Sequence, residues 1–182
     1  YLRGAYDSII SRSINLSVLI GNDNIYNGIQ TSANSIYIHI PEKQDDKFIY
    51  FTYNGKKRKI EKAVTRPYFQ TSSGCDSLNT YRPFHPNSFV IYPYKKVDGK
   101  TEFIYPKEIK IKYPNAYKFL HEHKTFLSNP KRDIKPAPET ANEWYRYGRH
   151  QSLEKCDVPS KIIVGVLSQG NKYAIDYYGT LI

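Results

Sequence analysis

The alternation of apolar and polar residues predicts β-hairpins along much of the chain. A β-rich run over 47–53 and a second over 56–60 flank Asn54-Gly55. Asn-Gly between two such runs is typical of a type I′ turn, so this stretch is expected to form a hairpin. The pattern therefore indicates antiparallel pairing of strands that are close in sequence.

Two further strand pairs are expected from the same signals. Asp98-Gly99 predicts a tight turn between strands over 87–94 and 101–105. Near the C-terminus the apolar run over 161–167 indicates a buried strand, and 172–176 is expected to pair with it.

The segment 24–40 reads as a strand, a polar turn over 30–34 and a second strand. Residues 35–40 alternate with β-branched and aromatic side chains, as a half-buried strand does. The periodicity of residues 1–20 does not decide between helix and strand, and this segment is interpreted as a lead-in that packs on the domain.

Short helices are expected after the second hairpin. Pro106 suits the first turn of a helix over 106–112, and one apolar face fits a longer helix over 113–127. Thr140, with Glu143 three residues later, resembles a capping box before a short helix through the only tryptophan, Trp144.

These elements indicate an α+β fold, with a mixed, mostly antiparallel twisted sheet, β-hairpins and a few packed helices. A chain of 182 residues is long enough to bury a core without disulfides. We expect a lead-in over 1–23 and one domain over 24–182. The chain begins with Tyr1 and has no methionine, so we expect it to be a fragment of a larger protein.

Composition favours an anionic partner. The chain has 27 Lys and Arg against 17 Asp and Glu, a formal charge of +10. Interleaved with these cations are 18 Tyr and 8 Phe, a composition that suits base stacking and phosphate contact. The simpler interpretation is a protein that is basic only for solubility. We find no signal peptide or membrane span, and two cysteines, Cys75 and Cys156, read as thiols in a reducing cytoplasm.

Several polar residues are candidates for DNA contact. The consecutive cations at the first hairpin suit phosphate binding, although lysines also protect edge strands from aggregation. Side chains of the 30–34 turn can reach base edges, although the same residues are common in turns. The candidates for phosphate are Lys56, Lys57, Arg58, Lys59 and Arg149, and those for bases are Gln30, Thr31, Asn34, Lys95 and Lys96.

Catalytic motifs are not found. The chain lacks the Asn/Asp-Pro-Pro-aromatic signature of amino-methyltransferases, a glycine-rich cofactor loop and a Gly-x-Ser-x-Gly elbow. Asp98, Glu108 and Lys110 follow the order of a metal-dependent nuclease site. Because Asp98 falls in a predicted turn and Glu108 in a predicted helix, a solvated charge run explains them better. We therefore assign no catalytic or metal-binding residue.

Taken together, motifs in order along residues 24–180 resemble the TaqI-like specificity domain of adenine-specific DNA methyltransferases and type IIG restriction-modification enzymes. The matching segments are Asn27–Asn34, Ile60-Glu61 with Arg66-Pro67, Ile91–Tyr94, Tyr113–Leu120, Glu143–Arg149, Lys161–Val164 and Tyr173–Asp176. The chain departs from the family at Ser32, where glycine is frequent, and it ends where the family continues with further strands and a closing helical segment.

The resemblance implies a target recognition domain that reads duplex DNA. The partner would be the methyltransferase domain of the same parent chain, which would use S-adenosylmethionine to methylate adenine N6. The parent could also have endonuclease activity. No cofactor is expected in this fragment. Residues that recur in a family of recognition domains more often maintain the fold than contact bases. Gly28, Trp144 and Gly148 are therefore expected to be structural.

Three alternatives stay open. The chain could belong to the specificity subunit of a type I restriction system, which uses related domains. It could be a nuclease fragment acting through Asp98, Glu108 and Lys110. It could also be an interaction module that does not bind DNA.

Overall fold

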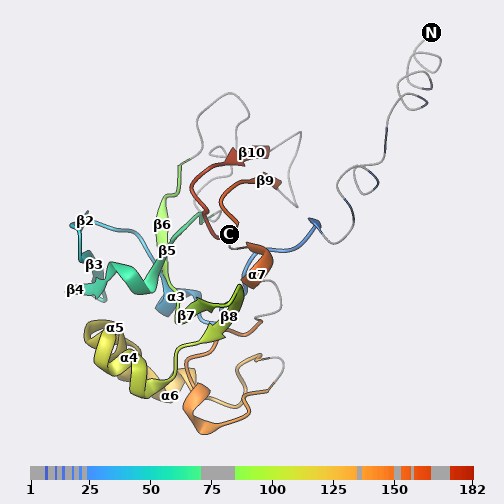
Figure 1. The fold of residues 1–182 in the computed structure, drawn as a ribbon. Helices are drawn as coiled ribbons and strands as arrows, with labels where there is room; N and C mark the ends of the chain where they lie inside the picture. The colour runs from blue at the N-terminus through green and yellow to red at the C-terminus, as the bar shows by residue number, and fades with distance from the viewer. Residues whose placement is uncertain are drawn as a thin grey trace.

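A computed structural model describes residues 24–70, 85–134, 137–149, 153–156, 158–164 and 173–182, together with residues 7, 11, 14, 18 and 21. Short helices and antiparallel strand pairs alternate along this part of the chain (Figure 1), which confirms the predicted α+β class. The described strands form four small sheets rather than one large sheet.

The sheets are built from strands of two to six residues. One sheet has the order β2–β3–β4 and another the order β1–β6–β5, while β7–β8 and β9–β10 are separate pairs. The bounds are β1 Ile38–His39, β2 Lys43–Gln44, β3 Phe48–Tyr53, β4 Lys56–Glu61, β5 Thr65–Tyr68, β6 Ser88–Ile91, β7 Tyr94–Val97, β8 Lys100–Phe103, β9 Lys161–Val164 and β10 Tyr173–Asp176.

The described helices are short. The α-helices are α3 Asn34–Tyr37, α4 Pro106–Lys112, α5 Pro114–Glu122, α6 Lys124–Leu127 and α7 Leu153–Cys156, and the 3₁₀ helices are η2 Lys62–Val64 and η5 Ala141–Glu143. Helices α4 and α5 pack together, and α5 also packs against β4 (Figure 1).

Both predicted tight turns are confirmed. Asn54 and Gly55 have φ of 49° and 73°, and Asp98 and Gly99 have φ of 50° and 79°. Positive φ at both central residues is what a type I′ turn requires. The helix predicted over 106–112 is also confirmed, and Pro106 stands in its first turn.

Five element predictions need correction. No strand is assigned over 24–29, where the first strand of the segment 24–40 was predicted, and the helix predicted over 113–127 is two helices, α5 and α6, separated at His123. The strand predicted over 35–40 is a helical turn, α3, followed by the two-residue β1, because the amides of Ile36 and Tyr37 bond the Ala33 carbonyl. The strand predicted over 87–94 divides at Pro93, which has no N–H for a strand ladder, into β6 and β7 of different sheets. The helix predicted through Trp144 is only the 3₁₀ turn η5.

The C-terminal hairpin is also less buried than its apolar sequence predicts. Strand β9 buries Ile163, but Ile162 and Val164 are 66% and 60% exposed. Only residues 161–164 of the predicted run over 161–167 lie in the described part of the chain. The predicted thiol Cys75 and most of the predicted lead-in lie outside it as well, whereas Cys156 is buried.

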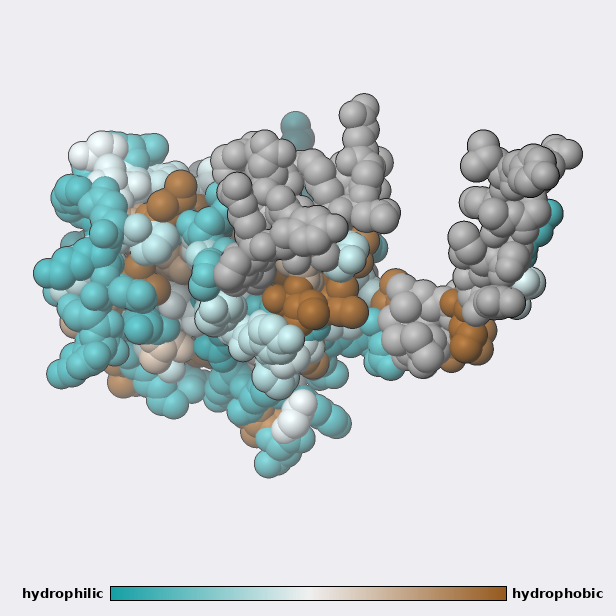
Figure 2. Space-filling view, turned by 90° about the horizontal axis from the view of Figure 1, so that it is seen from above, coloured by the Kyte–Doolittle hydropathy of each residue, from teal (hydrophilic) through white to brown (hydrophobic). Residues whose placement is uncertain are grey.

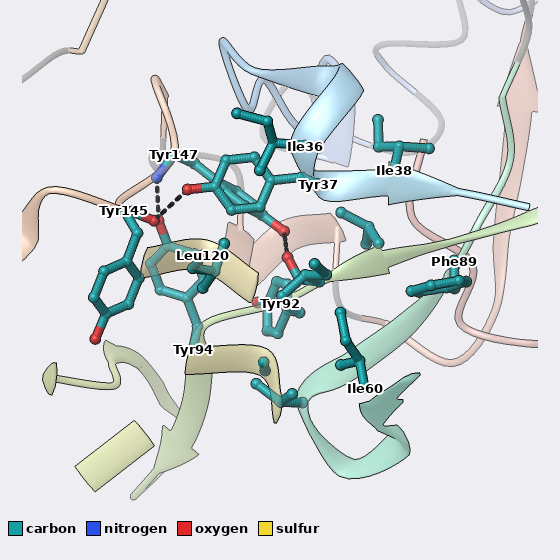
Figure 3. Packing of buried hydrophobic residues seen from close by; sticks show 14 of the residues in the cluster. Ile36, Tyr37, Ile38, Ile60, Phe89, Tyr92, Tyr94, Leu120, Tyr145 and Tyr147 are labelled. Carbon is teal, nitrogen blue, oxygen red and sulfur yellow. Dashed lines mark hydrogen bonds between the residues drawn. The ribbon is translucent and has the colours of Figure 1, made fainter. Parts of the chain in front are cut away.

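Tyrosine dominates the core. Tyr37, Tyr92, Tyr145 and Tyr147 are almost fully buried (Figure 3). Buried hydroxyls need partners, and backbone carbonyls supply them: Tyr37 donates to the Tyr145 carbonyl at 2.7 Å, while Tyr145 and Tyr147 donate to the carbonyls of Ile104 and Ile91. Much of the aromatic content that suggested base stacking is therefore structural.

Candidate nucleic-acid interface

The basic β3–β4 hairpin separates its four cations onto different faces. Strand alternation turns Arg58 toward α5, where its guanidinium pairs with both carboxylate oxygens of Glu122 at 3.0 and 2.7 Å. Lys56, Lys57 and Lys59 are exposed. Figure 2 shows that hydrophilic side chains dominate the end of the molecule that carries this sheet. The three lysines, and not Arg58, therefore face solvent.

The exposed lysines keep their charges accessible. Lys57 makes an ion pair with Glu42, but its side chain is 78% exposed. The Nζ of Lys59 lies 4.6 Å from the ring centroid of Phe48. Exposed pairs of this kind contribute little to stability, so an anion can replace the partner at small cost.

Glu61 holds the other end of β4 against α5. Its carboxylate accepts from the backbone amides of Asn115 and Ala116 at 2.9 and 3.0 Å. A carboxylate on the first amides of a helix satisfies donors that have no partner within the helix. Glu61 and Arg58 therefore fix the basic hairpin at both ends of α5.

The turn over residues 30–34, which we call the recognition turn, presents two amide side chains. Gln30 and Asn34 are exposed. Thr31 is 1% exposed, and its Oγ1 accepts from the Ala33 amide and donates to Asn34 Oδ1 at 2.6 Å. The hydroxyl of Thr31 is thus committed within the protein, whereas Gln30 and Asn34, like Ser32, are exposed to solvent.

Arg149 lies beside the recognition turn. Its amide donates to the Gln30 carbonyl at 3.0 Å, and Gly148 donates to Thr31 at 3.1 Å. The guanidinium pairs with Asp133 at 2.7 Å and is 25% exposed. Arg149 is therefore placed both to support the turn and to offer charge near it.

Close backbone approaches occur at two glycines. A Cβ at Gly148 would lie 2.5 Å from the Asp133 carbonyl oxygen and 2.6 Å from Ser32 Cβ. A Cβ at Gly28 would collide with the carbonyl of Ile182, which accepts from the Ile29 amide. Both positions therefore exclude a side chain unless the backbone moves.

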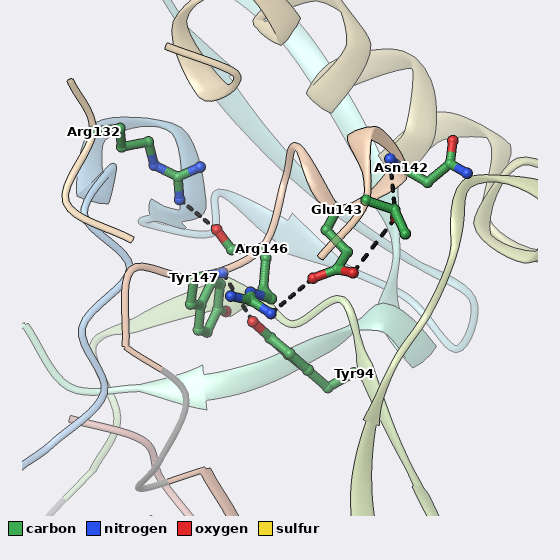
Figure 4. Close-up of polar contacts among 7 residues, drawn as sticks. Tyr94, Arg132, Asn142, Glu143, Arg146 and Tyr147 are labelled. Carbon is green, nitrogen blue, oxygen red and sulfur yellow. Dashed lines mark hydrogen bonds and ion pairs between the residues drawn. The ribbon is translucent and has the colours of Figure 1, made fainter. Parts of the chain in front are cut away.

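The Trp144 stretch is interior. Trp144 is 7% exposed, and Arg146 forms a buried ion pair with Glu143 at 2.7 Å (Figure 4). Thr140 caps η5 by accepting from Asn142, and the Tyr147 amide donates to the Tyr94 hydroxyl. Arg146, which stands between Tyr145 and Tyr147 in the sequence, neutralises a buried carboxylate.

The second hairpin places its lysines differently. Lys95 pairs with Glu108 of α4 at 2.7 Å, while Lys96 is exposed. Lys112 also contacts Glu108, and hydrogen bonds from Lys95 and Lys112 hold the pKa of that carboxyl below its usual value. Of the two lysines, Lys96 is therefore the more accessible to solvent.

The same contacts bear on the nuclease alternative. Asp98 occupies the β7–β8 turn, while Glu108 lies on α4 between two lysines. Within the described ranges, no three His, Cys, Asp or Glu side chains are grouped as a metal site requires. No contact described here favours a nuclease site at these residues.

Arg132 is the important residue that the sequence did not indicate. It lies in a segment with three prolines between α6 and η5, yet its guanidinium contacts backbone from three separate parts of the chain. No local pattern marks such a residue, because its partners are up to 101 positions away.

The chain is similar to one part of a known restriction-modification enzyme. Over 175 residues, which are 96% of this chain, it is 52% identical to the type II restriction enzyme and methyltransferase RM.Eco57I of Escherichia coli. The match spans 18% of that relative's length. No protein-family model matches the chain. The described residues contain no helix that is both long and apolar enough to cross a membrane.

Proposed function

We propose that this chain is the DNA target recognition domain, of the TaqI-like kind, of a restriction-modification enzyme. The observation that carries the proposal is the 52% identity, over 96% of the chain, to a segment of an enzyme named for both restriction and methylation. In this proposal residues 24–182 form the recognition domain, and its partner is double-stranded DNA.

The catalytic work belongs to other parts of the polypeptide in this proposal. A methyltransferase domain would use S-adenosylmethionine to methylate adenine N6 in the DNA that this domain holds. A relative that joins restriction and methylation in one protein supports this arrangement over the separate specificity subunit of a type I system.

Two surface features support a DNA-binding role. The lysines Lys56, Lys57 and Lys59 are exposed at the β3–β4 hairpin, as phosphate contacts require. The exposed amides of Gln30 and Asn34 have the paired donor and acceptor groups that match adenine edges in the major groove. Arg149 and Lys96 are further candidates, for phosphate and base contact respectively.

A gel-shift titration with random-sequence duplex DNA tests the proposal. If the three lysines each neutralise one phosphate, affinity should fall about 40-fold between 50 and 200 mM monovalent salt, because each contact releases counterions. A chain that binds no duplex at the lower salt, or whose affinity is unaffected by salt, would contradict the proposed function.

A further inference from the structure

Arg132 uses every N–H of its guanidinium. Its Nε donates to Ser32 Oγ at 2.9 Å, and Nη2 donates to the carbonyls of Thr31 at 2.8 Å and Arg146 at 2.6 Å. Its Nη1 donates to the carbonyls of Leu127 at 2.9 Å and Trp144 at 3.3 Å. A guanidinium has five such donors in a rigid plane, so one side chain fixes the relative positions of these segments.

Two of these bonds hold a strained part of the recognition turn. Ser32 has a φ of 55°, a left-handed conformation that costs energy for a residue with a side chain. Strained backbone persists where its surroundings determine it. Arg132 bonds the carbonyl of Thr31, the residue before this position, and the hydroxyl of Ser32 itself.

The other bonds connect the turn to rigid structure. Leu127 is the last residue of α6 and is fully buried, and Trp144 and Arg146 are 7% exposed. The guanidinium also lies 5.9 Å from the ring centroid of buried Tyr37. Figure 4 shows the bond from Arg132 to the Arg146 carbonyl. Through these contacts Arg132 connects the recognition turn to the core.

We propose that Arg132 is a positioning residue for base readout: it holds the recognition turn so that Gln30 and Asn34 present their amides to base edges in one orientation. The inference rests on the proposed function and adds a residue that does not itself touch DNA. Because two hydrogen bonds to an adenine edge need fixed geometry, a turn free to move would keep general DNA affinity and lose discrimination.

The test compares Arg132→Lys with Arg58→Lys as a matched control. Both arginines make several hydrogen bonds and both substitutions keep the charge, but Arg58 contacts α5 rather than the turn. The wild-type chain first selects its preferred duplex from a random library. Dissociation constants are then measured for that duplex and for a scrambled one.

The proposal predicts that Arg132→Lys lowers the ratio of the two affinities by roughly tenfold, the effect of one wrong base pair, while scrambled-duplex affinity is unchanged. Arg58→Lys should leave the ratio intact. Ser32→Ala, which removes one acceptor of Arg132, should lower the ratio by a smaller factor and serves if Arg132→Lys does not fold.

Coupling to the turn distinguishes positioning from a general loss of structure. In a chain that already carries Gln30→Ala and Asn34→Ala, Arg132→Lys should lower the affinity ratio no further. A further fall of roughly tenfold in the affinity ratio in that background, or an unchanged ratio in the folded Arg132→Lys chain, would overturn the proposed role of Arg132 and leave the proposed function standing. A wild-type chain that selects no sequence would instead overturn the proposed function.

Discussion

Buried hydroxyls give the core of this protein its specific geometry. Tyr147 lies at the centre of the tyrosine cluster, donating to the Ile91 carbonyl and contacting the rings of Tyr37 and Tyr94 at centroid distances of 5.0 and 5.1 Å. Each such bond joins the Trp144 stretch to a different strand or loop. The interior is therefore fixed by directional contacts as well as by apolar burial.

Removing one of these hydroxyls should be costly. Tyr147→Phe leaves the Ile91 carbonyl without this donor inside the core, so we expect the free energy of unfolding to fall by about 1–3 kcal/mol. Urea denaturation measures the change. Tyr177→Phe is the control, since Tyr177 is 70% exposed and should change stability little; equal effects of the two substitutions would contradict this account of the core.

A buried histidine should make stability depend on pH. The His39 ring stacks on Phe51 at 4.4 Å and bonds the Ile36 carbonyl at 2.8 Å. Burial lowers its pKa to about 4, from 6.5. Because the folded-state pKa lies below the unfolded one, the neutral ring favours folding above pH 6.5, and this contribution is lost as the pH falls toward about 4.

The free energy of unfolding should fall by on the order of 3 kcal/mol as the pH is lowered from 6.5 to about 4. Denaturation at a series of pH values measures it. His39→Gln, which keeps a donor for the Ile36 carbonyl, should remove most of the dependence of the unfolding free energy on pH. His121→Gln, on the exposed side of α5, should leave this dependence unchanged. His123, whose pKa burial also lowers, accounts for part of the remainder. A slope unaffected by His39→Gln would count against this assignment.

Within β4, alternation of side chains separates stability from binding. Arg58 faces α5, while Lys57 and Lys59 face solvent and Lys56 stands at the turn. In the sequence the four cations form one run. Because successive side chains of a strand point to opposite faces, Arg58 contacts α5 while Lys57 and Lys59 face solvent.

This division can be tested with two sets of substitutions. Replacing Lys56, Lys57 and Lys59 by alanine should weaken binding to all duplexes alike and reduce the slope of log affinity against log salt by about 2.7, with little change in stability. Arg58→Ala should instead destabilise the fold by about 1 kcal/mol, by analogy with other partly exposed pairs. Fluorescence anisotropy measures DNA binding, and urea denaturation measures stability. If the triple variant instead lost affinity for one preferred sequence only, these lysines would contact bases and not phosphates.

Local chemistry explains which elements were predictable. Asn54-Gly55 and Asp98-Gly99 determine their turns from two residues, and Pro106 marks a helix start without help from the rest of the fold. The segment 35–40 differs from the predicted half-buried strand because Ile36, Tyr37, Ile38 and His39 are all buried. Its side chains therefore do not alternate between a buried face and an exposed face.

Site residues were harder to predict because tertiary contacts decide their roles. Thr31 and Asn34 are both polar and both predicted to contact bases, but the hydroxyl of Thr31 is buried and the amide of Asn34 is exposed. The αL conformation of Ser32 is one that glycine adopts without strain, and the sequence alone does not show that a serine has it here. The sequence around Arg132 does not indicate its role, because most of its partners come from distant segments of the chain.

At the scale of the whole molecule, the surface divides into polar and apolar regions. The outer face of the β9–β10 hairpin exposes Ile162, Val164, Tyr173 and Ile175, in contrast to the basic end formed by the β2–β3–β4 sheet. The DNA contacts proposed here draw on the basic end and the recognition turn.

The proposed division of labour predicts how the isolated chain responds to the cofactor. Titration calorimetry with S-adenosylmethionine should give no binding heat, because the methyl donor would bind to another domain of the parent polypeptide. A saturable signal at one site per chain would place cofactor binding in this chain and contradict the division.

The most direct test of the central claim is selection of duplexes by this chain from a random-sequence library at low salt, followed by sequencing of the bound DNA. The account predicts enrichment of one short sequence, and Gln30→Ala or Asn34→Ala should weaken the preference at particular positions within it. Recovery of all sequences in equal proportion, or of no DNA at all, would contradict the claim that this domain reads a DNA target.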